Sequence, residues 1–405
     1  MATRARQGLP VRSLNALGGV ASSLGLRAGL SPDGLLASAR KQTGLTDFGP
    51  ETFRAGLEVL CASLEEEADL TPLGRVAART RLAGLLANRL RLVESLRNQA
   101  VAAEEVSRPI FVLGLPRTGT TVLYGMLAAD PAMRSPATWE VARPFPAPSG
   151  EDPARVKAME RDLAGFRRLA PGMDRIHPMG ARLPQECLAM HALELTSYEF
   201  PTTFPVPAYW SWLRRQDLAP AYRVERQLLQ HLQSGGRRGT HWVLKTPCHL
   251  MWLDVLLEVF PDALLVHTHR DPATVLASVS SLMTTMRSSV SRRVDPRRIG
   301  PEQLDAWTWG MERVMAVRDR LPADRVVDVR YEDTVADPVG TVQRVYRHLG
   351  LDLTPSVSVA VEGYLAANPR DKHGSHHYRL EDFGLEASEV REAFAAYNAR
   401  FGTAA

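Results

Sequence analysis

A glycine-rich stretch between an expected strand and an expected helix carries the clearest chemistry in the sequence. Gly114 to Thr121 reads GLPRTGTT, follows the apolar run 110–113 and precedes the apolar helical stretch 122–129. The spacing fits the phosphate-binding pattern G-x-x-x-x-G-K-[ST], in which backbone N–H groups and a helix N-terminus hold a phosphate. Thr120 stands where that pattern has its lysine. Nucleoside triphosphatases use this lysine on the β- and γ-phosphates, so we expect an anion site that does not hydrolyse a triphosphate.

The elements that must position this loop repeat the order strand, turn, helix. The expected strands and the helices that follow them are 110–113 with 122–129, 242–244 with 249–260, 263–266 with 272–286, and 325–329 with 338–349. Strands that alternate with helices indicate a mainly parallel sheet with helices on both faces. We therefore predict an α/β fold in which the glycine-rich loop follows the first strand.

The first hundred or so residues are expected to be helical. Thr71-Pro72 has the residue types of a helix N-cap and first turn, and Leu82, Leu86 and Val93 form one apolar stripe along the helix that follows. We predict a helical region over residues 1–108 packed on a main domain over 109–405. Residues 144–240, rich in proline, methionine and aromatic side chains, form an insertion that is expected to build the substrate-side wall of the site.

Composition narrows the classes of function. The chain has 405 residues, 49 basic and 45 acidic side chains, a net charge of +4 and three cysteines. Such a small net charge argues against nucleic-acid binding through the overall electrostatic field of the protein. Any anion site must therefore come from a local cluster of basic side chains. Three cysteines without C-x-x-C spacing argue against a disulfide framework or a zinc knuckle. No apolar run is long enough to span a membrane and the N-terminus lacks a signal-peptide pattern, so we expect a cytoplasmic protein without an integral membrane segment.

Three motifs resemble those of sulfotransferases that use 3′-phosphoadenosine 5′-phosphosulfate (PAPS). The loop PRTGTT, 116–121, looks like the 5′-phosphosulfate loop of the bacterial, tyrosylprotein-sulfotransferase-like branch. The motif HRDP, 269–272, and the segment VRYED, 329–333, resemble two further family motifs, and all three occur in order between residues 109 and 351. The resemblance implies a P-loop-type sheet. It also implies transfer of a sulfuryl group from PAPS to an acceptor hydroxyl, with no metal required.

The resemblance also implies which residues bind the cofactor. Arg270 and Ser278, eight positions apart, would hold the 3′-phosphate, and Tyr331 would lie near the adenine. The full predicted set is Arg117, Thr118, Gly119, Thr120, Thr121, Arg270, Ser278, Tyr331, Arg370 and Lys372. Arg370 and Lys372 match a C-terminal loop of the family only loosely, and the alternative is that they are ordinary solvated charges.

Sulfuryl transfer needs a base for the acceptor proton and cations for the oxygens of the transferring group. For the base we favour Glu140, because related enzymes carry a catalytic glutamate shortly after the loop helix; a capping or salt-bridging carboxylate is the alternative. His177 is the second candidate, since many cytosolic sulfotransferases use histidine, although it would also suit a core or a loop. Lys245, which follows the second strand, is expected to stabilise the transferring group together with Arg117.

Metal binding is not expected. His267-x-His269 and a histidine cluster at 373–377 are the candidate ligands, but we expect the first pair to lie on opposite faces of its strand.

The sequence determines the acceptor less well than it determines the cofactor. Aromatic residues between Tyr198 and Trp212 suit either an apolar pocket for a small or lipid-like alcohol or phenol, or plain core. Two other functions stay open, a P-loop small-molecule kinase and a non-catalytic nucleotide-binding scaffold, as does a homo-oligomer.

Overall fold

The computed structural model describes residue 15 and residues 28–173, 178–368 and 379–403. Its centre is a four-stranded, all-parallel sheet in the order β2-β1-β3-β4. The strands are β1 (Ile110–Gly114), β2 (Val243–Lys245), β3 (Leu264–His269) and β4 (Val326–Arg330). Because all four strands run the same way, their carboxyl ends meet at one edge of the sheet, where ligands of such folds bind. The predicted α/β fold is confirmed.

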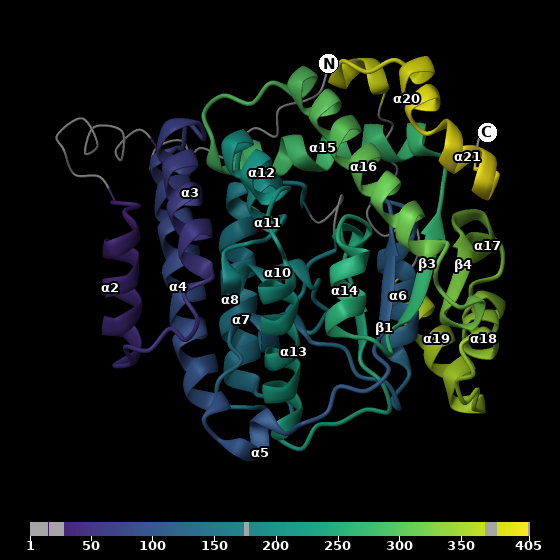
Figure 1. The fold of residues 1–405 in the computed structure, drawn as a ribbon, viewed down its shortest axis with the longest axis horizontal. Helices are drawn as coiled ribbons and strands as arrows, with labels where there is room; N and C mark the ends of the chain where they lie inside the picture. The colour runs from purple at the N-terminus through teal and green to yellow at the C-terminus, as the bar shows by residue number, and fades with distance from the viewer. Residues whose placement is uncertain (1–14, 16–27, 174–177, 369–378, 404–405) are drawn as a thin grey trace.

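Both faces of the sheet are covered by helices (Figure 1). Alternate residues of a strand point to opposite faces, and in β1 Ile110 and Val112 join one apolar cluster while Phe111 and Leu113 join the other. The first face is packed by α6 (Thr120–Ala129), α18 (Pro338–His348) and α19 (Pro355–Ala367). The second is packed by α13 (Ala219–Ser234), α14 (Leu253–Val259), α15 (Pro272–Val290) and α16 (Pro296–Arg318).

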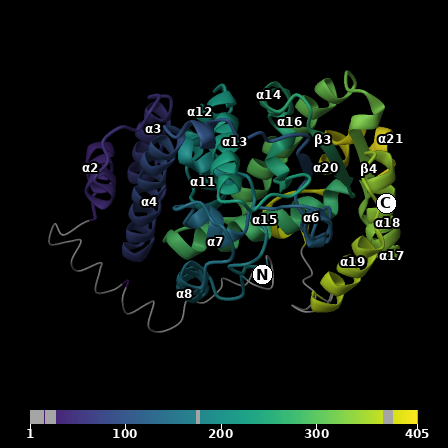
Figure 2. The same ribbon diagram turned by 90° about the horizontal axis from the view of Figure 1, so that it is seen from below.

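The N-terminal helices lie at the end of the molecule opposite β4, as both ribbon views show (Figures 1 and 2). They are α2 (Pro32–Thr43), α3 (Phe53–Glu66), α4 (Pro72–Leu96) and α5 (Gln99–Ala102). Thr71 caps α4 as predicted, with its Oγ1 accepting from the Gly74 N–H at 2.9 Å. The buried surface of α4 is wider than the single apolar stripe that was predicted. Leu90 and Leu92 are buried as well, whereas Val93, a residue of the predicted stripe, is only partly buried. The reason is that α4 contacts α2 as well as α13 and α15.

The predicted insertion, 144–240, folds into a series of helices, and several of its aromatic residues belong to the main core. The helices are α8 (Pro153–Leu169), α10 (Leu188–His191), η1 (Ala192–Glu194), α11 (Glu199–Thr203), α12 (Pro207–Leu213) and α13, while α7 (Thr138–Ala142) lies just before the insertion. Tyr198, Phe200 and Tyr209 are buried in the cluster that also contains the N-terminal helices. Of the two alternatives for the aromatic residues, an acceptor pocket or plain core, these three side chains therefore fit the core. The boundaries predicted for the helical region and for the insertion stay predictions.

Several element boundaries differ from the predictions. The third strand continues past Val266 to His269, and the helix expected over 249–260 is split into η2 (Pro247–Leu250) and α14. The remaining elements are η3 (Ala323–Arg325), α17 (Tyr331–Ala336), η4 (Leu380–Phe383), α20 (Ala387–Ala393) and α21 (Ala395–Phe401). None of the helices within the described ranges is long and apolar enough to cross a membrane.

Candidate active site

The two glycines of the loop are needed because other groups approach their backbone closely. Gly114 ends β1, and a Cβ atom there would lie 2.2 Å from Thr268 Oγ1. Gly119 is the N-cap residue of α6 with φ 87°, and a Cβ atom there would lie 3.1 Å from the ring of Tyr331. The spacing of these glycines thus places the start of α6 against both β3 and the residue that follows β4.

Arg117 joins the loop to two neighbouring elements. It has φ 67°, a left-handed conformation that non-glycine residues rarely adopt and that is common at functional sites. Its carbonyl oxygen accepts from Arg270 Nη1 at 2.9 Å, and its own Nε donates to Ser278 Oγ at 3.2 Å. Three of the predicted cofactor residues, distant in sequence, are therefore in direct contact.

Arg270 also lies over the ring of Tyr331, with its guanidinium carbon 3.9 Å from the ring centroid. A cavity of about 380 Å³ opens beside this pair, lined by Arg270, Asp271, Thr274, Tyr331, Glu332, Val335 and Ala336. An arginine fixed by an aromatic ring is well arranged to bind an anionic group, because its planar fork is already oriented. Arg270, predicted at the 3′-phosphate, and Tyr331, predicted near the adenine, thus meet at one cavity.

The threonines of the loop have different surroundings. Thr118 is buried, with its hydroxyl donating to the Leu115 carbonyl at 2.6 Å and 2.5 Å from Thr268 Oγ1. It therefore braces the loop against β3. Thr120 is also buried, whereas Thr121 is partly exposed and its hydroxyl faces Lys245.

Lys245 ends β2, the strand next to β1, and its side chain turns toward the start of α6. Its Nζ lies 3.4 Å from Thr121 Oγ1 and forms an ion pair with Glu186. Only 2% of the side chain is exposed. A buried ammonium is stable only beside an anion, so the lysine is held between the loop and a carboxylate.

That carboxylate, Glu186, is a candidate site residue that the sequence analysis missed. Thr246 Oγ1 donates to its second oxygen at 3.3 Å, and the side chain keeps 16% of its surface exposed. The next residue, Cys187, donates its backbone N–H to the Lys245 carbonyl at 3.0 Å, which fixes the segment alongside β2. The sequence around Glu186 has no motif or periodicity, so no signal marked it.

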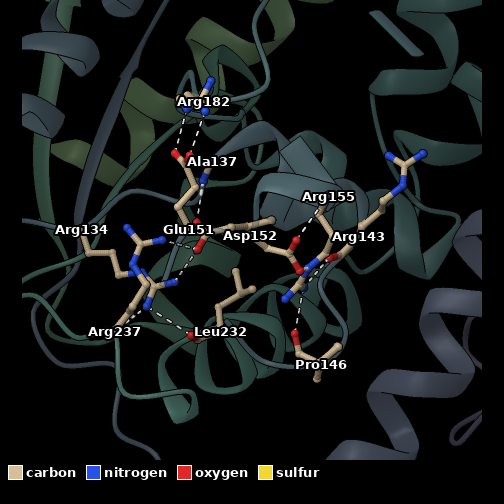
Figure 3. A network of polar contacts seen from close by, with 11 residues as sticks. Arg134, Ala137, Arg143, Pro146, Glu151, Asp152, Arg155, Arg182, Leu232 and Arg237 are labelled. Atoms are coloured by element: carbon tan, nitrogen blue, oxygen red, sulfur yellow. Dashed lines mark hydrogen bonds and ion pairs between the residues drawn. The ribbon is translucent and has the colours of Figure 1, made fainter. Parts of the chain in front are cut away.

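Glu140, the predicted base, lies in a different environment, beside Arg134, Ala137 and Arg237, which Figure 3 labels. Its carboxylate is fully buried and accepts from the Ala137 N–H at 2.9 Å, from Arg134 at 3.0 Å and from Arg237 at 2.9 Å. Burial lowers the pKa of Arg134 to about 10, which still leaves it charged at neutral pH. With three donors on two oxygens, this carboxylate holds α7 to the loop before β2. The structure favours the capping and salt-bridging alternative over the role as base.

Three other predicted site residues, His177, Arg370 and Lys372, lie outside the described residues.

The prediction that His267 and His269 lie on opposite faces of their strand, made against metal binding, was wrong. Residues two apart on a strand share a face, and the two rings lie 4.2 Å apart, close to Asp328. Arg318 contacts both His267 and Asp328, however, so a cation already occupies this cluster.

Comparison with known proteins agrees with this site. Residues 109–355 match the model of a family described as "Sulfotransferase family". The chain belongs to the sulfotransferase family.

Relatives of this sulfotransferase include solved structures that cover almost the whole chain. Sulfotransferase STF1 of Mycobacterium tuberculosis is 36% identical, with a TM-score of 0.79 over 90% of this chain and 98% of that one. Sulfotransferase STF9 of Mycobacterium avium is 28% identical, with a TM-score of 0.84 over 92% and 97%. Among curated proteins, omega-hydroxy-beta-dihydromenaquinone-9 sulfotransferase Stf3 of Mycobacterium bovis is 28% identical over 280 residues, 67% of this chain and 70% of the relative.

Membership of this family bears out the predicted activity, an enzyme that transfers a sulfuryl group. The two alternatives, a P-loop kinase and a silent scaffold, lose their support. The site agrees with this outcome, because the sulfotransferase has Thr120 where a P-loop kinase has its lysine and places Lys245 from the neighbouring strand beside Thr121.

Proposed function

We propose that this sulfotransferase moves the sulfuryl group of PAPS to the hydroxyl of an apolar, lipid-like alcohol or phenol. The observation that carries the proposal is the chain of contacts from Thr121 through Lys245 to Glu186 at the start of α6. It joins an anion-binding loop, a cation and a carboxylate that is partly exposed. These are the groups that sulfuryl transfer to a hydroxyl requires.

PAPS would bind with its 5′-phosphosulfate at the loop and its 3′-phosphate near Arg270 and Ser278. Backbone N–H groups at the start of α6 and the positive end of its dipole suit the 5′ group. The contact of Arg270 with Tyr331 and the cavity beside them suit the nucleoside and its 3′-phosphate. Since Arg117 touches both Arg270 and Ser278, binding at either end of the cofactor would order the other end.

Glu186 would act as the base in place of Glu140. As the acceptor oxygen attacks sulfur, the S–O bond to the 5′-phosphate breaks and the hydroxyl proton passes to a Glu186 oxygen. Adenosine 3′,5′-bisphosphate is then the leaving group. Lys245 and Arg117 would neutralise the charge that grows on the bridging and peripheral oxygens. Because Lys245 contacts both Thr121 and Glu186, one ammonium would serve the loop and the base.

A lipid-like acceptor is supported by the relative Stf3, whose name specifies an omega-hydroxylated dihydromenaquinone. In the present chain the insertion is rich in aromatic residues, of which Trp210 and Trp212 remain partly exposed. Tyr198, Phe200, Phe204 and Tyr209 are core, so we propose that the acceptor lies against the insertion surface on the Glu186 side and not among the buried rings. This placement would bring an acceptor hydroxyl to the partly exposed Glu186 side chain.

The test compares Glu186→Gln with the surface substitution Glu151→Gln. With PAPS and a panel of hydroxylated lipids and phenols, Glu186→Gln should lower kcat by about 10²- to 10⁴-fold, the usual contribution of a general base. Its affinity for adenosine 3′,5′-bisphosphate, measured by calorimetry, should stay unchanged, and Glu151→Gln should behave as the wild type. Near wild-type turnover of Glu186→Gln would remove it from the role of base. Tighter binding of ATP with Mg²⁺ than of the bisphosphate would overturn the proposed cofactor.

A further inference from the structure

A cluster of metal-ligand side chains lies in the interior directly behind the Glu186–Lys245 pair. Cys187 precedes α10, Glu225 lies on α13 and His249 lies on η2, and each has no exposed surface. Each offers a ligand atom within 4.8 Å of those of the other two. The mechanism above uses none of the three residues.

Two polar atoms of this cluster have no hydrogen-bond partner among the described residues, namely Glu225 Oε1 and His249 Nε2. The other polar atom of each side chain is held. Glu225 Oε2 lies 2.6 Å from His191 Nε2, and His249 Nδ1 lies 2.9 Å from the Tyr222 hydroxyl. Buried polar groups are nearly always satisfied, so two orphaned ligand atoms beside a thiol point to a missing cation.

We propose that Cys187, Glu225 and His249 bind a structural divalent transition-metal ion, for which Zn²⁺ is the best match. A thiolate, an imidazole and a carboxylate are the donors that Zn²⁺ takes in proteins. One thiolate and one carboxylate also neutralise its two charges, which an apolar interior requires. Tyr222 would accept from His249 Nδ1–H and so orient Nε2 toward the ion, an arrangement common around metal-bound histidines.

The fourth ligand of a closed zinc site would be His191. It follows Cys187 by four positions, the spacing that puts two side chains on one face of a helix, and its ring centroid lies 6.0 Å from that of His249. Binding would replace its hydrogen bond to Glu225 with a bond to the ion. All four donors would then come from three segments, α10 with the residue before it, α13 and η2.

The ion would fix the catalytic pair without taking part in transfer. Cys187 directly follows Glu186, and His249 comes four residues after Lys245, so an ion between them links the two segments that carry the pair.

The experiment measures metal content in full-length protein without a histidine tag. Zinc by mass spectrometry should reach about one ion per chain in the wild type. Cys61→Ser is the matched control, because Cys61 is also a buried free cysteine but lies on α3, and it should keep the ion. Cys187→Ser should lose it. Protein refolded with Co²⁺ should show thiolate-to-cobalt charge-transfer absorption in the wild type and in Cys61→Ser, and none in Cys187→Ser.

A second variant guards against misfolding of Cys187→Ser. Glu225→Gln keeps the shape of the side chain and a hydrogen-bonding oxygen toward His191, and it should release zinc to a chelator faster than the wild type while its circular dichroism is unchanged. Wild-type protein that carries no zinc above background, even after refolding with Zn²⁺, overturns the proposal. Zinc retained in full by Cys187→Ser and Glu225→Gln does the same, because the ion then lies elsewhere.

Discussion

The substitution Glu140→Gln separates the two roles considered for this carboxylate. It keeps the size of the side chain but removes the charge that faces Arg134 and Arg237. The Arg134 side chain is 5% exposed and that of Glu140 is 0% exposed, whereas that of Arg237 is 41% exposed, so the loss falls mainly on the pair with Arg134. Breaking a buried ion pair from one side costs about 3–5 kcal/mol, because the remaining charge stays buried.

That cost translates into a measurable melting temperature. Unfolding entropy of about 2.1 cal/mol/K per residue gives, over 405 residues, roughly 0.85 kcal/mol/K. A loss of 3–5 kcal/mol then lowers Tm by about 4–6 °C, which differential scanning fluorimetry resolves easily.

The control lies in the same region (Figure 3). Glu151 pairs with Arg182 through two hydrogen bonds of 2.7 and 2.8 Å, but both side chains are about half exposed. Exposed pairs contribute at most about 1 kcal/mol, so Glu151→Gln should shift Tm by about 1 °C or less. An unchanged Tm for Glu140→Gln, combined with lost turnover and retained cofactor binding, would refute the structural role and restore Glu140 as the base.

Two further predictions concern the cofactor site and the buried histidines. Arg270→Ala should weaken binding of adenosine 3′,5′-bisphosphate by about 10- to 150-fold, the loss expected for a charge-assisted hydrogen bond, while Arg313→Ala should not; equal calorimetric affinities would remove Arg270 from the 3′-phosphate. Burial, His269 and Arg318 hold the pKa of His267 well below its ordinary 6.5. The unfolded chain therefore binds the extra proton below that pH, so lowering the pH from 7.5 to 5.5 should cost about 1.4 kcal/mol of stability through this residue. In urea titrations at the two pH values, His267→Gln should lose less stability than the wild type, by about that amount. An equal loss of stability in both proteins would show that His267 is not the group that titrates.

The fold was predictable because its strands are short apolar runs separated by glycine and proline. Prediction of β1 erred by one residue at its end, since Gly114 still pairs with Thr268. The end of β3 was missed because His267 and His269 are polar. They are nevertheless buried, since Arg318 contacts Nδ1 of His267 and Asp328 pairs with Nε2 of His269. These contacts join residues that are far apart in the sequence, so the sequence near the two histidines contains no sign of them.

The site was predictable where its residues lie at strand ends and not where they come from the insertion. Arg117, Arg270 and Tyr331 follow strands whose carboxyl ends must meet, so their contact follows from the parallel sheet itself. Glu186 reaches Lys245 across 59 positions that contain the helices α10 to α13. Its place depends on how the short helices of the insertion pack, which residue spacing does not determine.

The same parallel sheet explains how the loop works without the lysine of a P-loop. Lys245 pairs in register with Val112, two residues before Gly114, so the end of β2 reaches the same edge as the loop. A lysine at position 120 would lie on α6 and could serve the phosphates only. A lysine from the neighbouring strand contacts Thr121 on one side and Glu186 on the other. Moving the positive charge from the loop to β2 thus connects the loop to the proposed base, which suits transfer to a hydroxyl that must lose its proton at the same time.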